Sequence, residues 1–242
     1  MIFQLAVFIS SIGRVAIGSF EHIIPIFFAF VFAFFFIRFS IKWSANKQQK
    51  ALHFFAVFVS LTIIIFHAYY FSLGNYNFKT DLPLYLCSFI ALLIPIFTFY
   101  RKHWMYEVLL FWIVAGTLQG VITPDIAEGF PTFDYFRYWI VHLGLLIIVF
   151  YATFVFGMRP TFKSIFKSVL ALQVYVVMMV AINALLDANY FYLNEKPKSA
   201  SVLDYFGDWP YYIIVTQLIL VPYFLVIYLP FYIEKRRKKQ SI

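Results

Sequence analysis

Long runs of apolar residues, separated by short polar or charged connections, cover nearly the whole chain. A run of about 20 apolar residues is long enough to cross a bilayer as an α-helix. This pattern predicts an all-α, polytopic membrane bundle of about seven transmembrane helices. The expected helices lie at roughly 22–42, 50–73, 82–100, 104–123, 135–156, 165–186 and 210–233.

The two ends of the chain differ from these runs. Residues 1–20 are shorter and mixed in character, and we expect an interfacial helix there, because Gly13, Arg14 and Gly18 do not fit a cleaved signal. Residues 234–242 form a basic tail. No stretch of soluble composition exceeds a short connection, so residues 1–242 are predicted to be a single transmembrane domain.

Composition supports this class of protein. The chain is 63% hydrophobic and only 12% charged, against about 25% charged residues in soluble domains. Its one cysteine excludes an internal disulfide and every multi-cysteine metal pattern. We see no glycine-rich nucleotide-binding loop, so neither a metal nor a cofactor is expected.

Charge predicts the orientation. With seven spans, fourteen of the nineteen Lys and Arg residues fall on the side of the carboxyl terminus, and nine of the eleven carboxylates fall on the other. The positive-inside rule then places the carboxyl terminus in the cytoplasm and the amino terminus outside. The net charge of +8 is explained by a cytoplasmic face that attracts anionic lipid headgroups, not nucleic acid.

The candidate chemistry is a cysteine and a histidine at one depth. Cys87 lies six residues after Asp81, and His142 about seven after the start of its span, so each is roughly 9–11 Å below the outer boundary at about 1.5 Å per residue. A thiol beside an imidazole can act as an acyl-accepting nucleophile. Helix rotation and adjacency, which decide whether the two meet, do not follow from the spacing.

Two other interpretations remain open for these residues. His67 lies near the same outer level and is a rival to His142. A buried cysteine is usually an inert small hydrophobe, and an intramembrane histidine is as often a packed residue as a functional one.

Further polar residues gather at the outer side. Asp125, between the fourth and fifth spans, either sets the tautomer of an imidazole or caps the following turn. Gln119 lies one turn earlier and needs a partner if buried. Arg137 is suited equally to a phospholipid phosphate and to an ion pair with Asp134.

Several strings, taken in order, resemble one known family. They are Asp81-Leu-Pro-Leu-Tyr-Leu-Cys87-Ser88, Gly116-Thr-Leu-Gln119-Gly-Val-Ile-Thr-Pro124-Asp125 with Gly129-Phe-Pro131, His142, and Asn189-Tyr-Phe-Tyr-Leu-Asn-Glu-Lys196-Pro197 through Trp209-Pro210. The chain resembles the YwaF-like family of bacterial integral membrane proteins, which is similar to eukaryotic transmembrane protein 164. The resemblance extends from Glu21-His22 to the seventh span.

This resemblance implies a cysteine-dependent phospholipid acyltransferase in the bacterial cytoplasmic membrane. Cys87 is then the nucleophile and His142 the base, and an acyl chain moves from a phospholipid to a lysophospholipid through a thioester at the outer-leaflet level. A backbone amide near Ser88, or the side chain of Gln119 or Asn189, is expected to stabilise the oxyanion.

Two alternative functions remain. Water in place of the lysolipid would make the protein a lipid hydrolase with the same Cys/His pair. A transporter or small-molecule-binding bundle would instead line a polar path with His67, Gln119, His142 and Asn183. The sequence predicts no particular oligomeric state.

Overall fold

The computed structural model describes residues 13–74 and 76–240. This part of the chain contains helices and no strand, which confirms the all-α prediction. The long helices are α2 (Phe20–Ser40), α3 (Ala45–Ser72), α4 (Leu86–Tyr100), α5 (His103–Trp112), α7 (Phe133–Phe154), α8 (Phe162–Leu186) and α9 (Tyr211–Gln240). Shorter elements are the π-helix η1 (Ile113–Thr117), α6 (Leu118–Ile122), and the 3₁₀ turns η2 (Tyr190–Tyr192) and η3 (Val202–Phe206).

Within the described residues, six helices are long and apolar enough to span a membrane, with α5, η1 and α6 forming one of them. The remaining predicted helix, the third in chain order (82–100), corresponds to α4 and is shorter than expected. It begins at Leu86 instead of residue 82 and has 15 residues, a length of about 22 Å against a hydrocarbon layer of about 30 Å. Pro83 accounts for part of the late start, because proline disfavours helical geometry in Leu82, the residue before it.

The predicted interfacial helix over 1–20 falls mostly on residues 1–12, outside the described part of the chain. Residues 13–19 are not helical, and α2 begins at Phe20.

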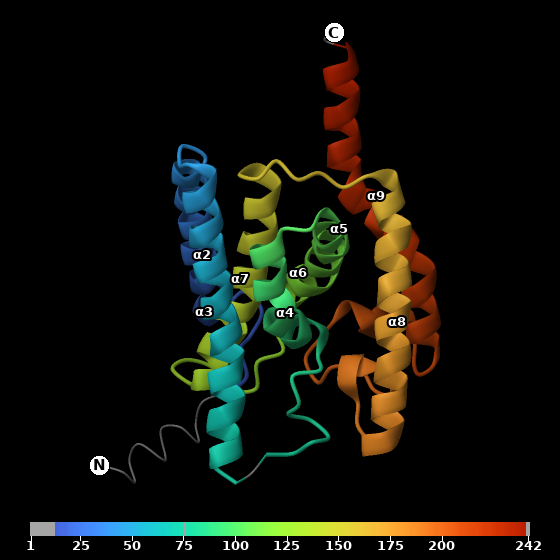
Figure 1. The fold of residues 1–242 in the computed structure, drawn as a ribbon. Helices are drawn as coiled ribbons and strands as arrows, with labels where there is room; N and C mark the ends of the chain where they lie inside the picture. The colour runs from blue at the N-terminus through green and yellow to red at the C-terminus, as the bar shows by residue number, and fades with distance from the viewer. Residues whose placement is uncertain (1–12, 75, 241–242) are drawn as a thin grey trace, which may run out of the picture.

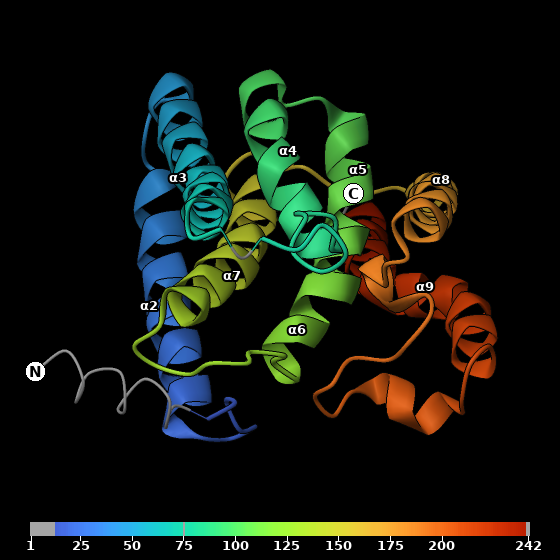
Figure 2. The same cartoon turned by 90° about the horizontal axis from the view of Figure 1, so that it is seen from below.

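The bundle has two sides joined by a central group. Helices α2, α3 and α7 lie on one side, α8 and α9 on the other, and α4 and α5 between them in both views (Figures 1 and 2). Helix α7 is the most enclosed of the six spans, whereas α2 has the smallest buried share. Phenylalanines such as Phe27, Phe30 and Phe34 project from α2. An apolar exterior of this kind suits contact with lipid tails.

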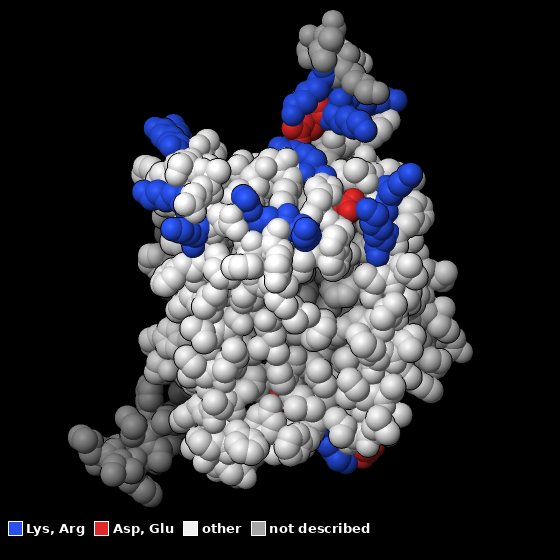
Figure 3. Space-filling view, viewed as in Figure 1, with Lys and Arg blue, Asp and Glu red and all other residues white. Residues whose placement is uncertain are grey.

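Charge differs strongly between the two ends of the bundle. Lys and Arg gather at the end from which the last turns of α9 project, above a belt of uncharged side chains (Figure 3). The described structure therefore has one basic end, as the sequence predicted.

Close packing of α7 against α3 depends on Gly144. A Cβ atom at this position would lie 2.6 Å from Cγ2 of Val59 on α3. We expect Gly144→Ala to destabilise the protein by about 1–3 kcal/mol, the usual cost of overpacking, and to lower its thermal unfolding midpoint in detergent.

The control is the same substitution in a Val59→Ala background, where the clashing methyl group is gone. There Gly144→Ala should have little effect, so that the two substitutions are strongly non-additive. Equal melting of Gly144→Ala and the wild type would contradict this account of the α3–α7 contact.

Candidate active site

A cavity of about 680 Å³ lies inside the bundle, toward the end opposite the basic one. Its walls come from the start of α4, the α5–η1–α6 span, the first halves of α7 and α9, Leu172 of α8, and the connections before α2, after α6 and after α8. Six of the eight predicted site residues line it, namely Cys87, Ser88, Gln119, Asp125, Arg137 and His142. Asn189 and His67 are not among the lining residues.

Cys87 is the second residue of α4. The first backbone bond of this helix runs from the Phe89 amide to the Tyr85 carbonyl (2.9 Å), so the amides of residues 86–88 precede the helical ladder. The depth predicted for Cys87 assumed a helix from Asp81 onward. That assumption was wrong, because residues 81–85 are not helical.

Tyrosine side chains satisfy the non-helical backbone that leads to Cys87. The Tyr190 hydroxyl accepts from the Leu82 amide (2.9 Å) and donates to the Phe78 carbonyl (2.8 Å). The Tyr175 hydroxyl on α8 donates to the Leu84 carbonyl. These contacts fix the position at which α4 begins, and so the position of the thiol.

Thr117, which sequence reasoning missed, contacts the sulfur. Its Oγ1 lies 3.5 Å from Sγ of Cys87, and the side chain is fully buried at the last position of η1. π-Helical turns are rare and occur frequently at functional sites. The string Gly116-Thr117 in the sequence carried no signal of this turn, because no residue type specifies it.

The imidazole of His142 is held in one tautomer. Its Nδ1 lies 2.8 Å from the carbonyl oxygen of Tyr138. A carbonyl oxygen can only accept, so Nδ1 carries the proton and Nε2 of the neutral ring is left as a base. The ring stacks on Tyr138 with centroids 3.9 Å apart.

Nε2 faces the short helix α6. A Cβ atom on Gly120 would lie 2.9 Å from Nε2, so only glycine leaves room for the imidazole here. Thr117 and Gly120 are three residues apart on one helical span, where side-chain positions are neighbours on one face. The thiol and the imidazole therefore contact adjacent positions of the same helix.

Asp125 neither contacts His142 nor caps the following turn. Its carboxylate accepts hydrogen bonds from Arg14, from the Ser199 hydroxyl (2.8 Å) and from the Tyr192 hydroxyl (3.3 Å). Burial, with the adjacent Asp125 carboxylate, raises the pKa of Tyr192, which keeps the phenol protonated as a donor. Three connecting segments therefore meet at Asp125: the residues before α2, the α6–α7 connection and the chain after α8.

The remaining predicted residues have other partners. Arg137 is ion-paired with Asp134 and lies 4.6 Å from the ring centre of Phe66. Gln119 donates to the Thr123 hydroxyl (3.1 Å). Asn189 accepts from the amides of Asn194 and Glu195, and Nδ1 of His67 lies 3.1 Å from the Tyr76 hydroxyl.

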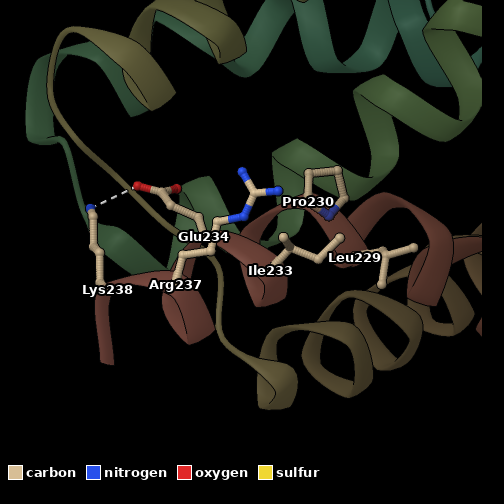
Figure 4. A pocket seen from close by; sticks show the side chains of 6 residues that line it. All are labelled: Leu229, Pro230, Ile233, Glu234, Arg237 and Lys238. Atoms are coloured by element: carbon tan, nitrogen blue, oxygen red, sulfur yellow. Dashed lines mark hydrogen bonds and ion pairs between the residues drawn. The ribbon is translucent and has the colours of Figure 1, made fainter. Parts of the chain in front are cut away.

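Among the described residues, no group of three or more His, Cys, Asp or Glu side chains is arranged to hold a metal ion. A second, more open pocket lies along the projecting end of α9. Its lining residues are Leu229, Pro230, Ile233, Glu234, Arg237 and Lys238 (Figure 4). Glu234 pairs there with Lys238 (2.8 Å), and none of the predicted site residues reaches this pocket.

Fold and site together define a polytopic helical membrane protein with a cysteine and a histidine in one internal cavity. The TMEM164 family model matches residues 17–228, and the chain belongs to the TMEM164 family. This confirms the relationship to transmembrane protein 164 that the sequence motifs predicted. Comparison with curated proteins and with solved structures gave no match.

The contact between Gly120 and the imidazole allows a test of the site. Gly120→Ala places a methyl group 2.9 Å from Nε2, closer than van der Waals contact allows, so we expect a displaced ring and alkylation of Cys87 by N-ethylmaleimide that is slowed several-fold. Because Cys87 is the only cysteine, intact mass spectrometry follows its alkylation directly.

Gly116→Ala is the matched control, since a Cβ there meets only the end of the flexible Leu86 side chain, at 3.1 Å. It should alkylate at close to the wild-type rate. Unchanged alkylation in Gly120→Ala would mean that the ring position has no influence on the thiol.

Proposed function

We propose that this protein is a membrane-embedded acyltransferase that moves a fatty acyl chain between a phospholipid and a lysophospholipid through a thioester on Cys87. One observation carries the proposal. Cys87 and His142 line the same cavity, and the hydrogen bond from Nδ1 to Tyr138 leaves Nε2 of His142 as the basic nitrogen. Membership of the TMEM164 family is consistent with this chemistry.

In the first half-reaction, Sγ of Cys87 attacks the carbonyl carbon of an acyl ester while its proton passes to Nε2 of His142. The tetrahedral intermediate collapses with cleavage of the bond between the carbonyl carbon and the glycerol oxygen. The imidazolium returns the proton to that oxygen. The products are a lysophospholipid and an acyl thioester on Cys87.

In the second half-reaction, a hydroxyl of another lysophospholipid gives its proton to Nε2, and its oxygen attacks the thioester carbon. The carbon–sulfur bond breaks, and the sulfur takes the proton back from the imidazolium. Protein and base return to their starting state, and a new phospholipid ester has formed.

The oxyanion of each intermediate needs hydrogen-bond donors. The amides of residues 86–88, at the positive end of the α4 dipole, are the best placed, because they precede the helical ladder beside the sulfur. Gln119 also lines the cavity, whereas the Asn189 side chain is occupied in its own loop. Loss of one such donor typically costs about 2.7–4 kcal/mol in the transition state.

The cavity also suits a lipid. Apolar side chains of α5, α8 and α9, including Trp112, Leu172 and Phe224, line it together with the cationic side chains of Arg14, Arg137 and Lys198. Apolar side chains suit an acyl chain, and cationic side chains suit a phosphate.

The transport alternative receives less support. His67 and Asn183, which a polar path was expected to use, do not line the cavity. Both hydrogen bonds of the Asn183 side chain are made with the backbone of Tyr190 (2.8 and 2.9 Å). A hydrolase would share the first half-reaction, so the reaction product separates it from a transferase.

The central experiment incubates the purified protein with mixed phospholipids and follows its intact mass. We expect a fatty-acyl adduct on Cys87 that hydroxylamine removes, because hydroxylamine cleaves thioesters. Cys87→Ser should lose the adduct and acyl transfer while melting at nearly the wild-type temperature. His142→Ala should reduce adduct formation at least a hundredfold, the scale of general base catalysis.

His67→Ala is the matched control, because it removes a histidine that lies outside the cavity, and it should leave the adduct intact. Transfer of labelled acyl chains to added lysolipid identifies a transferase, whereas release of free fatty acid alone identifies a hydrolase. An unmodified wild-type mass, with no lysolipid formed, would overturn the proposal.

Orientation completes the proposal: the cavity faces the outer leaflet of a bacterial cytoplasmic membrane, and the basic end lies in the cytoplasm. In a Cys87→Ser background, a cysteine at Asp208, whose side chain is 99% exposed, should react with an impermeant maleimide on intact spheroplasts. A cysteine at Lys235, in the projecting end of α9, should react only after permeabilisation. The reverse pattern would place the cavity toward the cytoplasm.

A further inference from the structure

The hydroxyl of Thr117 has an unusual partner for a threonine within a helix. A helical threonine commonly donates to the backbone carbonyl four residues earlier. Thr62, Thr153 and Thr216 do so here, at 3.0, 2.8 and 2.6 Å. The Thr117 hydroxyl differs: among residues 13–74 and 76–240, its only hydrogen-bond contact is with Sγ of Cys87.

The π-helix accounts for this difference. Hydrogen bonds to the fifth residue widen the turn, so the backbone around Thr117 departs from the α-helical spacing on which the usual bond depends. The hydroxyl is fully buried and is directed across the helix interface to α4, where the sulfur lies. A buried hydroxyl that gives up its ordinary acceptor needs another one.

We propose that Thr117 is a positioning residue for the nucleophile: its hydroxyl holds the Cys87 side chain in place and donates a hydrogen bond to the sulfur as the thiol proton passes to His142. This inference rests on the proposed function and adds a residue that acts on the reacting atom. One face of the η1–α6 span then serves both partners, with Thr117 at the sulfur and Gly120 making room for Nε2.

The other titratable and charged groups around the thiol come from several elements. They are Tyr85 before α4, Arg137, Tyr138 and His142 on α7, and Tyr175 on α8. Substitution of Thr117 leaves all of them in the chain, so a change in thiol reactivity reports on the hydroxyl.

The test measures the rate of Cys87 alkylation by N-ethylmaleimide across a range of pH in the full-length protein in detergent. Thr117→Val keeps the shape of the side chain and removes the hydroxyl. We expect its rate at pH 7.5 to fall about tenfold, in line with a hydrogen bond to a charged group, and to recover at higher pH. Thr117→Ser keeps the hydroxyl and should stay within about twofold of the wild type.

Thr98→Val is the matched control, because Thr98 is a fully buried threonine on α4 itself whose hydroxyl contacts backbone carbonyls and Nδ1 of His53 (3.0 Å) but not the sulfur. It should leave Cys87 alkylation unchanged. Thr117→Ala is a second variant without the hydroxyl and should show the same loss as Thr117→Val even if valine disturbs the packing.

A Thr117→Val rate equal to the wild type at every pH would overturn the inference, as would a Thr117→Ser variant as slow as Thr117→Val. Alkylation needs no acyl donor, so its outcome is separate from that of the proposed function. If the wild type forms no acyl adduct, the proposed function is contradicted, whatever the alkylation rates are. If the adduct forms normally but Thr117→Val alkylates at the wild-type rate, only the role of Thr117 is contradicted.

Discussion

The position of Cys87 depends on the hydrogen bonds made by the non-helical backbone that precedes it. Peptide groups at membrane depth need partners within the protein, because lipid tails offer none. Here the hydroxyls of Tyr190 and Tyr175 bond the backbone of residues 78–84. This allows α4 to begin at Leu86, so that the thiol lies at the start of a helix and lines the cavity.

The same arrangement joins the connections at this end of the bundle to the candidate site. Tyr190 belongs to the chain after α8, and the Asp125 carboxylate links Arg14, Tyr192 and Ser199 in the wall of the cavity. These connections therefore act as parts of the site. A substitution in them is expected to affect Cys87 even where it touches no lipid.

The opposite end of the bundle uses polar groups for a different purpose. The almost fully buried Glu107 accepts from Ser164 (2.5 Å) and Lys167 (2.7 Å), which joins α5 to α8. A buried carboxylate is costly unless it is paired in this way. The cavity is lined mainly by apolar and aromatic side chains, which suits the lipid substrate that we propose.

The sequence by itself determined the seven helices, the basic end and the residue types of the site, because span length, charge and chemistry are local properties. It also singled out Cys87 and His142, which line one cavity. The tertiary structure alone decided that α4 starts late, that the Tyr138 carbonyl and not Asp125 orients the imidazole, and that Thr117 meets the sulfur. The physical reason is that these contacts depend on helix rotation and neighbours, and helices that are apolar all round give no periodic signal for either.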